Sequence, residues 1–127
     1  INYFAYTKNN LKMLKKNNFI LNIVTSKDKI RTKKFLNDTF KLFTYVECNN
    51  DDVKGKPHPN QINSIISKLN VNRNQCVYIG DTHIDYLTAK NSKIDFIFAE
   101  WGYGKRYKYR YKCKNLSNLN KIVKTNS

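Results

Sequence analysis

The sequence predicts an α/β fold built on a parallel sheet. Short segments that are apolar at nearly every position alternate with longer segments whose apolar residues recur at helical spacing. Continuous apolar runs of this length are typical of strands covered on both faces. With 127 residues and a hydrophobic content of 40%, the chain is long enough for one domain with its own core.

The first half of the chain is predicted to contain two helices and two strands. Helices are placed where apolar residues recur every three or four positions, and strands where they run together. The expected order is a helix over 6–17, a strand over 19–24, a helix over 26–38 and a strand over 43–48. A turn is expected at Asn49-Asn50-Asp51-Asp52, because these residues favour turns.

The second half continues the alternation. Pro59 suits the first position of a helix, because its missing N–H would have no partner there. The expected elements are a helix over 59–69, a strand over 76–79, a helix over 82–92, a strand over 94–99 and a last helix over 116–123. Strands separated by helices run parallel, and such sheets bind ligands outside the carboxyl ends of their strands.

The net charge is +15, which would suit a polyanion such as nucleic acid. The positive residues are mostly lysines spread from Lys8 to Lys124 among many asparagines, so we interpret them as a bias of composition and expect no nucleic-acid partner. No apolar run is long enough to span a membrane, and no secretory leader is visible. Three widely spaced cysteines are consistent with a reducing cytoplasm.

Thr25 and Ser26 directly follow the strand expected over 19–24. Hydroxyl groups and backbone N–H groups at the start of a helix can together bind a phosphate group. The alternative is that one of the two residues caps the helix that follows. Both interpretations remain open from the sequence.

Lys56 stands in the sequence Lys54-Gly55-Lys56-Pro57-His58-Pro59, in the loop after the strand expected over 43–48. Proline restricts the backbone of the residue before it, so Lys56 is held while the loop is stiffened. A lysine on such a loop can direct its ammonium group at a fixed anion. The alternative is an ordinary solvated lysine in a lysine-rich chain.

Asp81 and Asp85 follow the strand expected over 76–79 and a glycine, Gly80. Their spacing of four residues places both carboxylates on one side of a helix start, and Gly80 lets the backbone approach a ligand closely. A few carboxylate ligands suit Mg²⁺, which keeps several waters and shares phosphate oxygens with the substrate. The alternative is a pair of capping carboxylates that bind no metal.

The order of these motifs resembles that of the haloacid dehalogenase-like hydrolases, in particular the phosphoglycolate phosphatase-like branch. The segment IVTSK resembles the second motif of that family, KGKPHP the third and VYIGDTHIDYLTAKNS the fourth, and AEWGYG resembles the segment after the next strand. The resemblance runs from about residue 6 to residue 122. It implies a three-layer, Rossmann-like sheet and a Mg²⁺-dependent phosphatase acting on a small phosphorylated metabolite.

The resemblance also implies a role for each matching residue. Thr25, with Ser26 beside it, would bind the transferring phosphoryl group, and Lys56 would neutralise its charge. Two unit charges about 4 Å apart at an effective dielectric constant near 20 interact by roughly 4 kcal/mol. Asp81 would bind Mg²⁺, and Asp85 would support that metal site.

The chain lacks the residues that the family uses for covalent chemistry. Members form an aspartyl-phosphate on the first aspartate of an Asp-x-Asp pair that stands on the first strand, and no Asp-x-Asp occurs in this sequence. The helical cap of the family is also absent. Residues 1–127 are therefore expected to be the carboxyl-terminal part of the core domain, inactive alone and paired with a complementing amino-terminal segment.

A second hypothesis is a nucleic-acid-binding module. Residues 105–114 alternate basic and aromatic side chains, and an extended strand of this kind has one cationic face and one aromatic face. The alternative is a surface segment that joins the sheet to the last helix, with its tyrosines packed down and its lysines in water.

Overall fold

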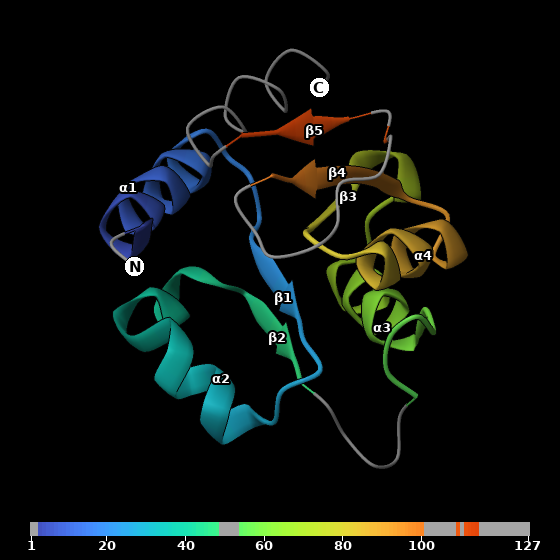
Figure 1. The fold of residues 1–127 in the computed structure, drawn as a ribbon, viewed down its shortest axis with the longest axis horizontal. Helices are drawn as coiled ribbons and strands as arrows, with labels where there is room; N and C mark the ends of the chain where they lie inside the picture. The colour runs from blue at the N-terminus through green and yellow to red at the C-terminus, as the bar shows by residue number, and fades with distance from the viewer. Residues whose placement is uncertain (1–2, 49–53, 101–108, 110, 115–127) are drawn as a thin grey trace.

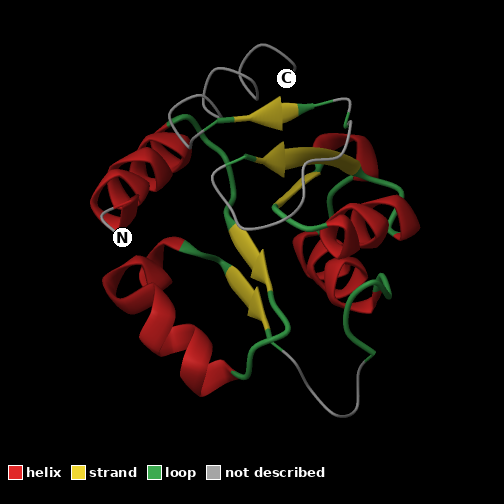
Figure 2. Cartoon of the chain, in the orientation of Figure 1, coloured by secondary structure: helices red, strands yellow, loops and turns green. Residues whose placement is uncertain are grey.

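The computed structural model describes residues 3–48, 54–100, 109 and 111–114, with side chains from Lys8 onward. The predicted turn at 49–52 and the predicted last helix over 116–123 lie outside the described residues. Figure 1 shows the order of the elements, and Figure 2 shows helices and strands alternating along the chain. The elements are α1 (Tyr3–Lys16), β1 (Asn22–Val24), α2 (Lys29–Leu36), the 3₁₀ helix η1 (Asn37–Leu42), β2 (Tyr45–Glu47), α3 (Asn60–Leu69), the 3₁₀ helix η2 (Arg73–Gln75), β3 (Val77–Gly80), α4 (His83–Asn91), β4 (Asp95–Ala99) and β5 (Lys112–Cys113).

All strand pairs in the described residues are parallel, which confirms the α/β prediction. The strands form two separate sheets, one with the order β1-β2 and one with the order β3-β4-β5. β4 therefore has a neighbour on both edges, while β1 and β3 each have one described neighbour. Val24 pairs with Glu47 in the first sheet, and Gly80 pairs with Phe98 in the second.

The region predicted as one helix over 26–38 is divided in two. Asp28 is the N-cap of α2, and its side chain accepts a hydrogen bond from the backbone N–H of Arg31 at 2.8 Å. α2 ends at Asn37, which has a φ of 51°. Asparagine tolerates this left-handed region better than most residues, but a helix cannot continue through it, and the chain goes on as the 3₁₀ helix η1.

The face of α2 that packs inward is not its most apolar one. Thr32 and Leu36 are buried, whereas Ile30 is 72% exposed and Phe35 is 49% exposed. The spacing of four residues between Thr32 and Leu36 sets the inward face. The hydroxyl of Thr32 can be buried there because it donates to the Asp28 carbonyl oxygen at 2.7 Å.

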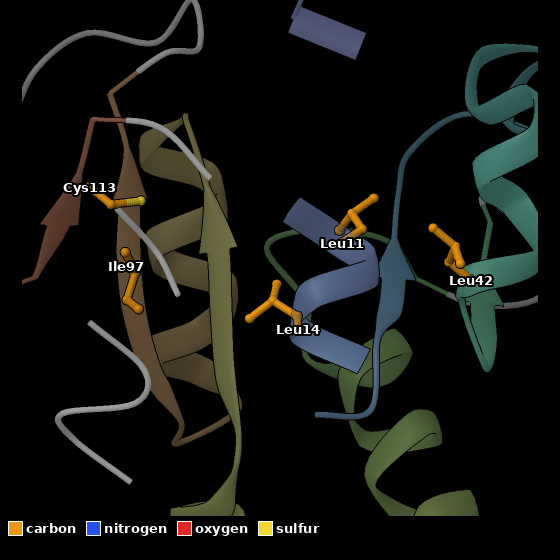
Figure 3. Packing of buried hydrophobic residues seen from close by; sticks show 5 residues of the cluster. All are labelled: Leu11, Leu14, Leu42, Ile97 and Cys113. Carbon is orange, nitrogen blue, oxygen red and sulfur yellow. The ribbon is translucent and has the colours of Figure 1, made fainter. Parts of the chain in front are cut away.

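One hydrophobic cluster connects α1 to the three-stranded sheet and to η1. Leu11 and Leu14 of α1 share this cluster with Leu42 of η1, Ile97 of β4 and Cys113 of β5 (Figure 3). Burial, together with the nearby charge of Glu100, raises the pKa of the Cys113 thiol to about 12. α1 therefore belongs to a core that it shares with the three-stranded sheet and with η1.

A second cluster covers the α4 side of the three-stranded sheet. It contains Ala89 of α4 and the β4 residues Phe96 and Phe98, with Tyr109 packed against them. None of the described helices has the length and apolar character that crossing a membrane requires.

Candidate functional site

The strongest polar contact at the predicted site joins two residues that are 29 positions apart. Lys56 lies in the loop before α3, and Asp85 lies in the first turn of α4. Lys56 Nζ is 2.7 Å from Asp85 Oδ1, and the two side chains are only 16% and 8% exposed. The structure thus brings together two of the five residues predicted for the site in a buried ion pair.

Asp85 is also held by its own end of the helix. Its Oδ2 accepts from the backbone N–H of Thr82 at 3.3 Å, and its own N–H donates to Thr82 Oγ1 at 3.1 Å. This reciprocal pair is a capping box, which satisfies N–H groups that have no partner inside the helix. Asp85 therefore caps α4 and binds Lys56 with different carboxylate oxygens.

Gly80 is required by the position of Asp85. A Cβ atom at residue 80 would lie 2.4 Å from Asp85 Cβ and 2.5 Å from Asp85 Oδ2. Real side chains do not approach so closely, so any other residue would displace the carboxylate. The glycine predicted to allow close approach to a ligand here allows the close approach of Asp85.

Tyr78 of β3 belongs to the site and was missed by the sequence reasoning. Its hydroxyl lies 3.2 Å from Asp85 Oδ1 and 3.4 Å from the Val24 carbonyl oxygen of β1. Burial raises the pKa of Tyr78 well above its usual range, and the negative charges of Asp85 and Asp81 raise it further. A tyrosine in an aliphatic strand, three residues before a conspicuous aspartate, was the available signal.

Asp81 stands at the junction of β3 and α4. It follows the last residue of the strand, precedes the N-cap Thr82 and is half-buried. Its influence on the pKa of Tyr78 shows that both aspartates act on the same place. Within the described residues, no group of three or more His, Cys, Asp and Glu side chains gathers to hold a metal ion.

Thr25 is fixed at the carboxyl end of β1. Its backbone N–H donates to the Glu47 carbonyl oxygen at 3.0 Å, and its Oγ1 accepts from the Lys27 N–H at 3.1 Å. Because a hydroxyl has one hydrogen of its own, Thr25 can accept from Lys27 and still donate to an anion. Ser26 is exposed beside it. Neither residue caps α2, since Asp28 does so.

The loop that carries Lys56 is tied down on both sides of this residue. The His58 N–H donates to the Gly55 carbonyl oxygen at 3.0 Å and closes a turn, and the Lys56–Pro57 peptide bond within it is cis. The side chain of Asn91, at the end of α4, donates to the Pro57 carbonyl oxygen at 2.8 Å. α4 therefore holds this loop at both of its ends, through Asp85 and through Asn91.

The basic and aromatic segment is described only in part. Residues 105–108 and 110 lie outside the described residues. The ring of Tyr109 stacks on Phe98 with centroids 5.0 Å apart, and Tyr111 packs against the core, while Lys112 is exposed. The described part of this segment packs its aromatic rings inward.

Comparisons with known proteins show what the chain is similar to. A family model described as haloacid dehalogenase-like hydrolase matches residues 1–99. A phosphoglycolate phosphatase of Colwellia psychrerythraea is 44% identical over 48 residues, which are 38% of this chain and 21% of that protein. These residues are too few to transfer its activity.

Solved structures share the fold. A predicted phosphoglycolate phosphatase from Haemophilus somnus superposes with a TM-score of 0.83 at 22% identity, covering 91% of this chain and 55% of that one. A 2-haloacid dehalogenase from Pseudomonas syringae superposes with a TM-score of 0.75 at 23% identity, covering 93% of this chain and 51% of that one. The chain spans about half the length of these structures.

Proposed function

Because the chain belongs to the haloacid dehalogenase-like hydrolases, we propose that it forms part of a Mg²⁺-dependent phosphatase that hydrolyses a small phosphorylated metabolite. The observation that carries this proposal is the buried pair of Lys56 and Asp85 at the carboxyl end of β3, with Thr25 at the carboxyl end of β1. Ligands of parallel α/β sheets bind at these strand ends. The partial match to a phosphoglycolate phosphatase supports a phosphomonoester substrate.

Each candidate site residue has a defined role in this proposal. Thr25 donates its free hydroxyl hydrogen to a phosphoryl oxygen, with Ser26 beside it in the phosphate-binding loop. The ammonium group of Lys56 stabilises negative charge on the phosphoryl group and on the nucleophile. Asp85 holds the ammonium group of Lys56 in position, because the two side chains form a buried ion pair.

Asp81 is the residue best placed to hold Mg²⁺. Both oxygens of Asp85 already accept hydrogen bonds, so Asp85 supports the metal site through Lys56 and the start of α4. The residues are consistent with this ion, because Mg²⁺ binds through one or two carboxylates and otherwise keeps water and phosphate oxygens. When bound, Mg²⁺ would neutralise charge that develops on the phosphoryl oxygens.

The nucleophile must come from outside this sequence, which contains no Asp-x-Asp. The Thr25 N–H bonds to Glu47 of β2 and the Leu21 carbonyl bonds to Thr44 just before β2. The Val24 carbonyl points away from β2, where the Tyr78 hydroxyl contacts it, and an added strand would replace this contact. β3 has its one described partner, β4, on one edge. We propose that a complementing amino-terminal segment adds a parallel strand between β1 and β3 and carries the nucleophilic aspartate to their ends. This strand would complete the core domain, and residues 1–127 would form the carboxyl-terminal part of that domain. We propose that the protein acts in the cytoplasm.

Complementation tests the proposal. The 127-residue chain alone should release no phosphate from an aryl phosphate in the presence of Mg²⁺. The chain mixed with an apolar strand peptide that ends in Asp-x-Asp should release phosphate, and Asp81→Asn should abolish this activity. The matched control is the same peptide with Asn-x-Asn, which can pair as a strand but cannot form an aspartyl-phosphate. Equal turnover with and without the first peptide would contradict the proposal.

A further inference from the structure

Gln61 of α3 is a buried polar residue that none of the roles above uses. It is 2% exposed, and its side-chain nitrogen faces three backbone carbonyl oxygens. Nε2 lies 3.1 Å from the oxygen of Thr25, 3.2 Å from that of Glu47 and 3.1 Å from that of Cys48. One amide group therefore joins the carboxyl ends of β1 and β2.

The orientation of this amide follows from its surroundings. If the group were flipped, Oε1 would face three other acceptors, so Nε2 must occupy this position. Oε1 is buried and has no hydrogen-bond partner among the described residues. Gln61 thus leaves one buried acceptor unpaired while it satisfies carbonyl groups at the ends of two strands, and an unpaired buried acceptor is costly.

The carbonyl of Thr25 connects this arrangement to the phosphate-binding loop. The sheet holds the Thr25 N–H through Glu47, and Gln61 holds the Thr25 carbonyl from the opposite end of the residue. With both ends fixed, Oγ1 of Thr25 stays in position to accept from the Lys27 N–H.

We propose that Gln61 is a positioning residue of the phosphoryl site, acting on the substrate through the backbone of Thr25. This inference rests on the proposed function of the Thr25 loop in phosphate binding. Gln61 touches no reacting group itself, and it fixes the conformation of the turn from which Thr25 donates its hydroxyl.

Amide hydrogen exchange of the 127-residue chain tests the positioning role, because it can be followed at low protein concentration by mass spectrometry. In Gln61→Met the amides of segment 25–28 should exchange about tenfold faster, since the loss of the Nε2 contacts leaves buried carbonyl oxygens without a donor. Segment 43–45 contains the Thr44 N–H, which bonds to Leu21 at the opposite end of β1 and β2, and it should change less than about twofold. Equal acceleration of both segments would show a purely structural role and overturn the proposal.

A matched control and a pH series separate positioning from general destabilisation. Ser64 lies on the same helix as Gln61, and its hydroxyl donates to the Glu47 side chain at 3.0 Å. Ser64→Ala removes this bond and should leave the exchange of segment 25–28 unchanged. In Gln61→Glu the ionised carboxylate can only accept, whereas the protonated form donates one O–H. Burial beside three carbonyl oxygens raises the pKa of a carboxyl at this position above its ordinary value. After correction for intrinsic exchange, segment 25–28 should therefore regain protection as the pH is lowered from alkaline values in Gln61→Glu and not in Gln61→Met. Absence of this difference would also overturn the proposal, and Gln61→Glu serves as the test if Gln61→Met does not fold.

Inorganic phosphate distinguishes this inference from the proposed function. In the wild-type chain phosphate should raise the midpoint of thermal unfolding, and Gln61→Met should lose this increase while Ser64→Ala keeps it. If phosphate does not stabilise the wild-type chain, the proposed role of the Thr25 loop fails and Gln61 has no role in phosphate binding, and the exchange comparison then decides only whether Gln61 fixes the backbone of Thr25. If Gln61→Met keeps the full increase, the proposal for Gln61 is wrong.

Discussion

β4 and the pair β1 and β3 are equally apolar in sequence but differ in burial. Four of the five residues of β4 are buried, and Phe98 is only 2% exposed. No residue of β1 or β3 is fully buried, although their sequences are NIV and VYIG. β4 is paired on both edges, whereas β1 and β3 are each paired on one described edge. For these three strands burial follows the number of paired edges, whereas Cys113 of the edge strand β5 is buried through its cluster with α1.

The half-covered strands also leave apolar side chains in water. Ile20, just before β1, is 55% exposed, and Val77 at the start of β3 is 37% exposed. Open strand edges of this kind readily pair with other chains. This physical need for a partner supports the complementing strand under the proposed function.

The largest effect should come from removing a side chain on the fully paired strand. Phe98→Ala should lower the free energy of unfolding by about 3–5 kcal/mol, because it leaves a cavity next to Tyr109. The matched change on a half-covered strand, Ile23→Ala, should cost roughly half as much. Urea unfolding followed by circular dichroism measures both. Equal costs would break the comparison between the two kinds of strand.

A smaller but still large effect is expected where a half-covered strand ends in a buried ion pair. Lys56→Ala leaves the carboxylate of Asp85 buried without its cation, and it should lower the free energy of unfolding by about 3 kcal/mol at pH 7. The double variant Lys56→Met with Asp85→Asn should recover most of this loss, since no charge remains buried and asparagine can still accept from Thr82. A single variant as stable as the wild type would show that the pair is solvated.

The smallest effect concerns Tyr78 and depends on pH. Tyr78→Phe removes the hydroxyl between β3 and β1 and should cost about 1 kcal/mol at neutral pH. Because the folded state raises the pKa of Tyr78, its contribution is complete below the unfolded value near 10 and is lost as pH rises above it. Thermal melts from pH 8 to pH 11 should therefore show a steeper alkaline loss of stability in the wild type than in the variant. Parallel profiles would exclude this role for Tyr78.

The order of the elements could be predicted because it depends on local periodicity. Every helix and strand expected between residues 6 and 99 is present, and the loops that carry Thr25, Lys56 and Asp81 follow the expected strands. The ends of the elements were less accurate. β1 is limited to three residues because a strand extends only as far as its ladder with β2. The break at Asn37, inside the helix predicted over 26–38, was not predicted.

The residues that support the site could not be found from patterns along the chain. Gln61 falls on the same inward face of α3 as Ile65. In the sequence it looks like a polar exception on an apolar face, and its contacts with the ends of β1 and β2 cannot be predicted from that pattern. Tyr78 looks like one more apolar position of a strand. The short β5 was not predicted either, because its pairing partner in β4 decides its position.

The sequence by itself determined the family resemblance, the parallel α/β fold and the strand ends where Thr25, Lys56 and Asp81 stand, since motifs and hydrophobic periodicity are local properties of the chain. Only the tertiary structure decided that Lys56 pairs with Asp85, that Gly80 makes room for Asp85, and that β1 and β3 do not pair with each other. The first and third depend on distances between segments that are far apart in sequence, and the second depends on how the chain turns from β3 into α4. Asp81 and Asp85 illustrate this difference between local and tertiary information. Their spacing alone predicted that both lie at one helix start, whereas the partners of Asp85 depend on three-dimensional contacts.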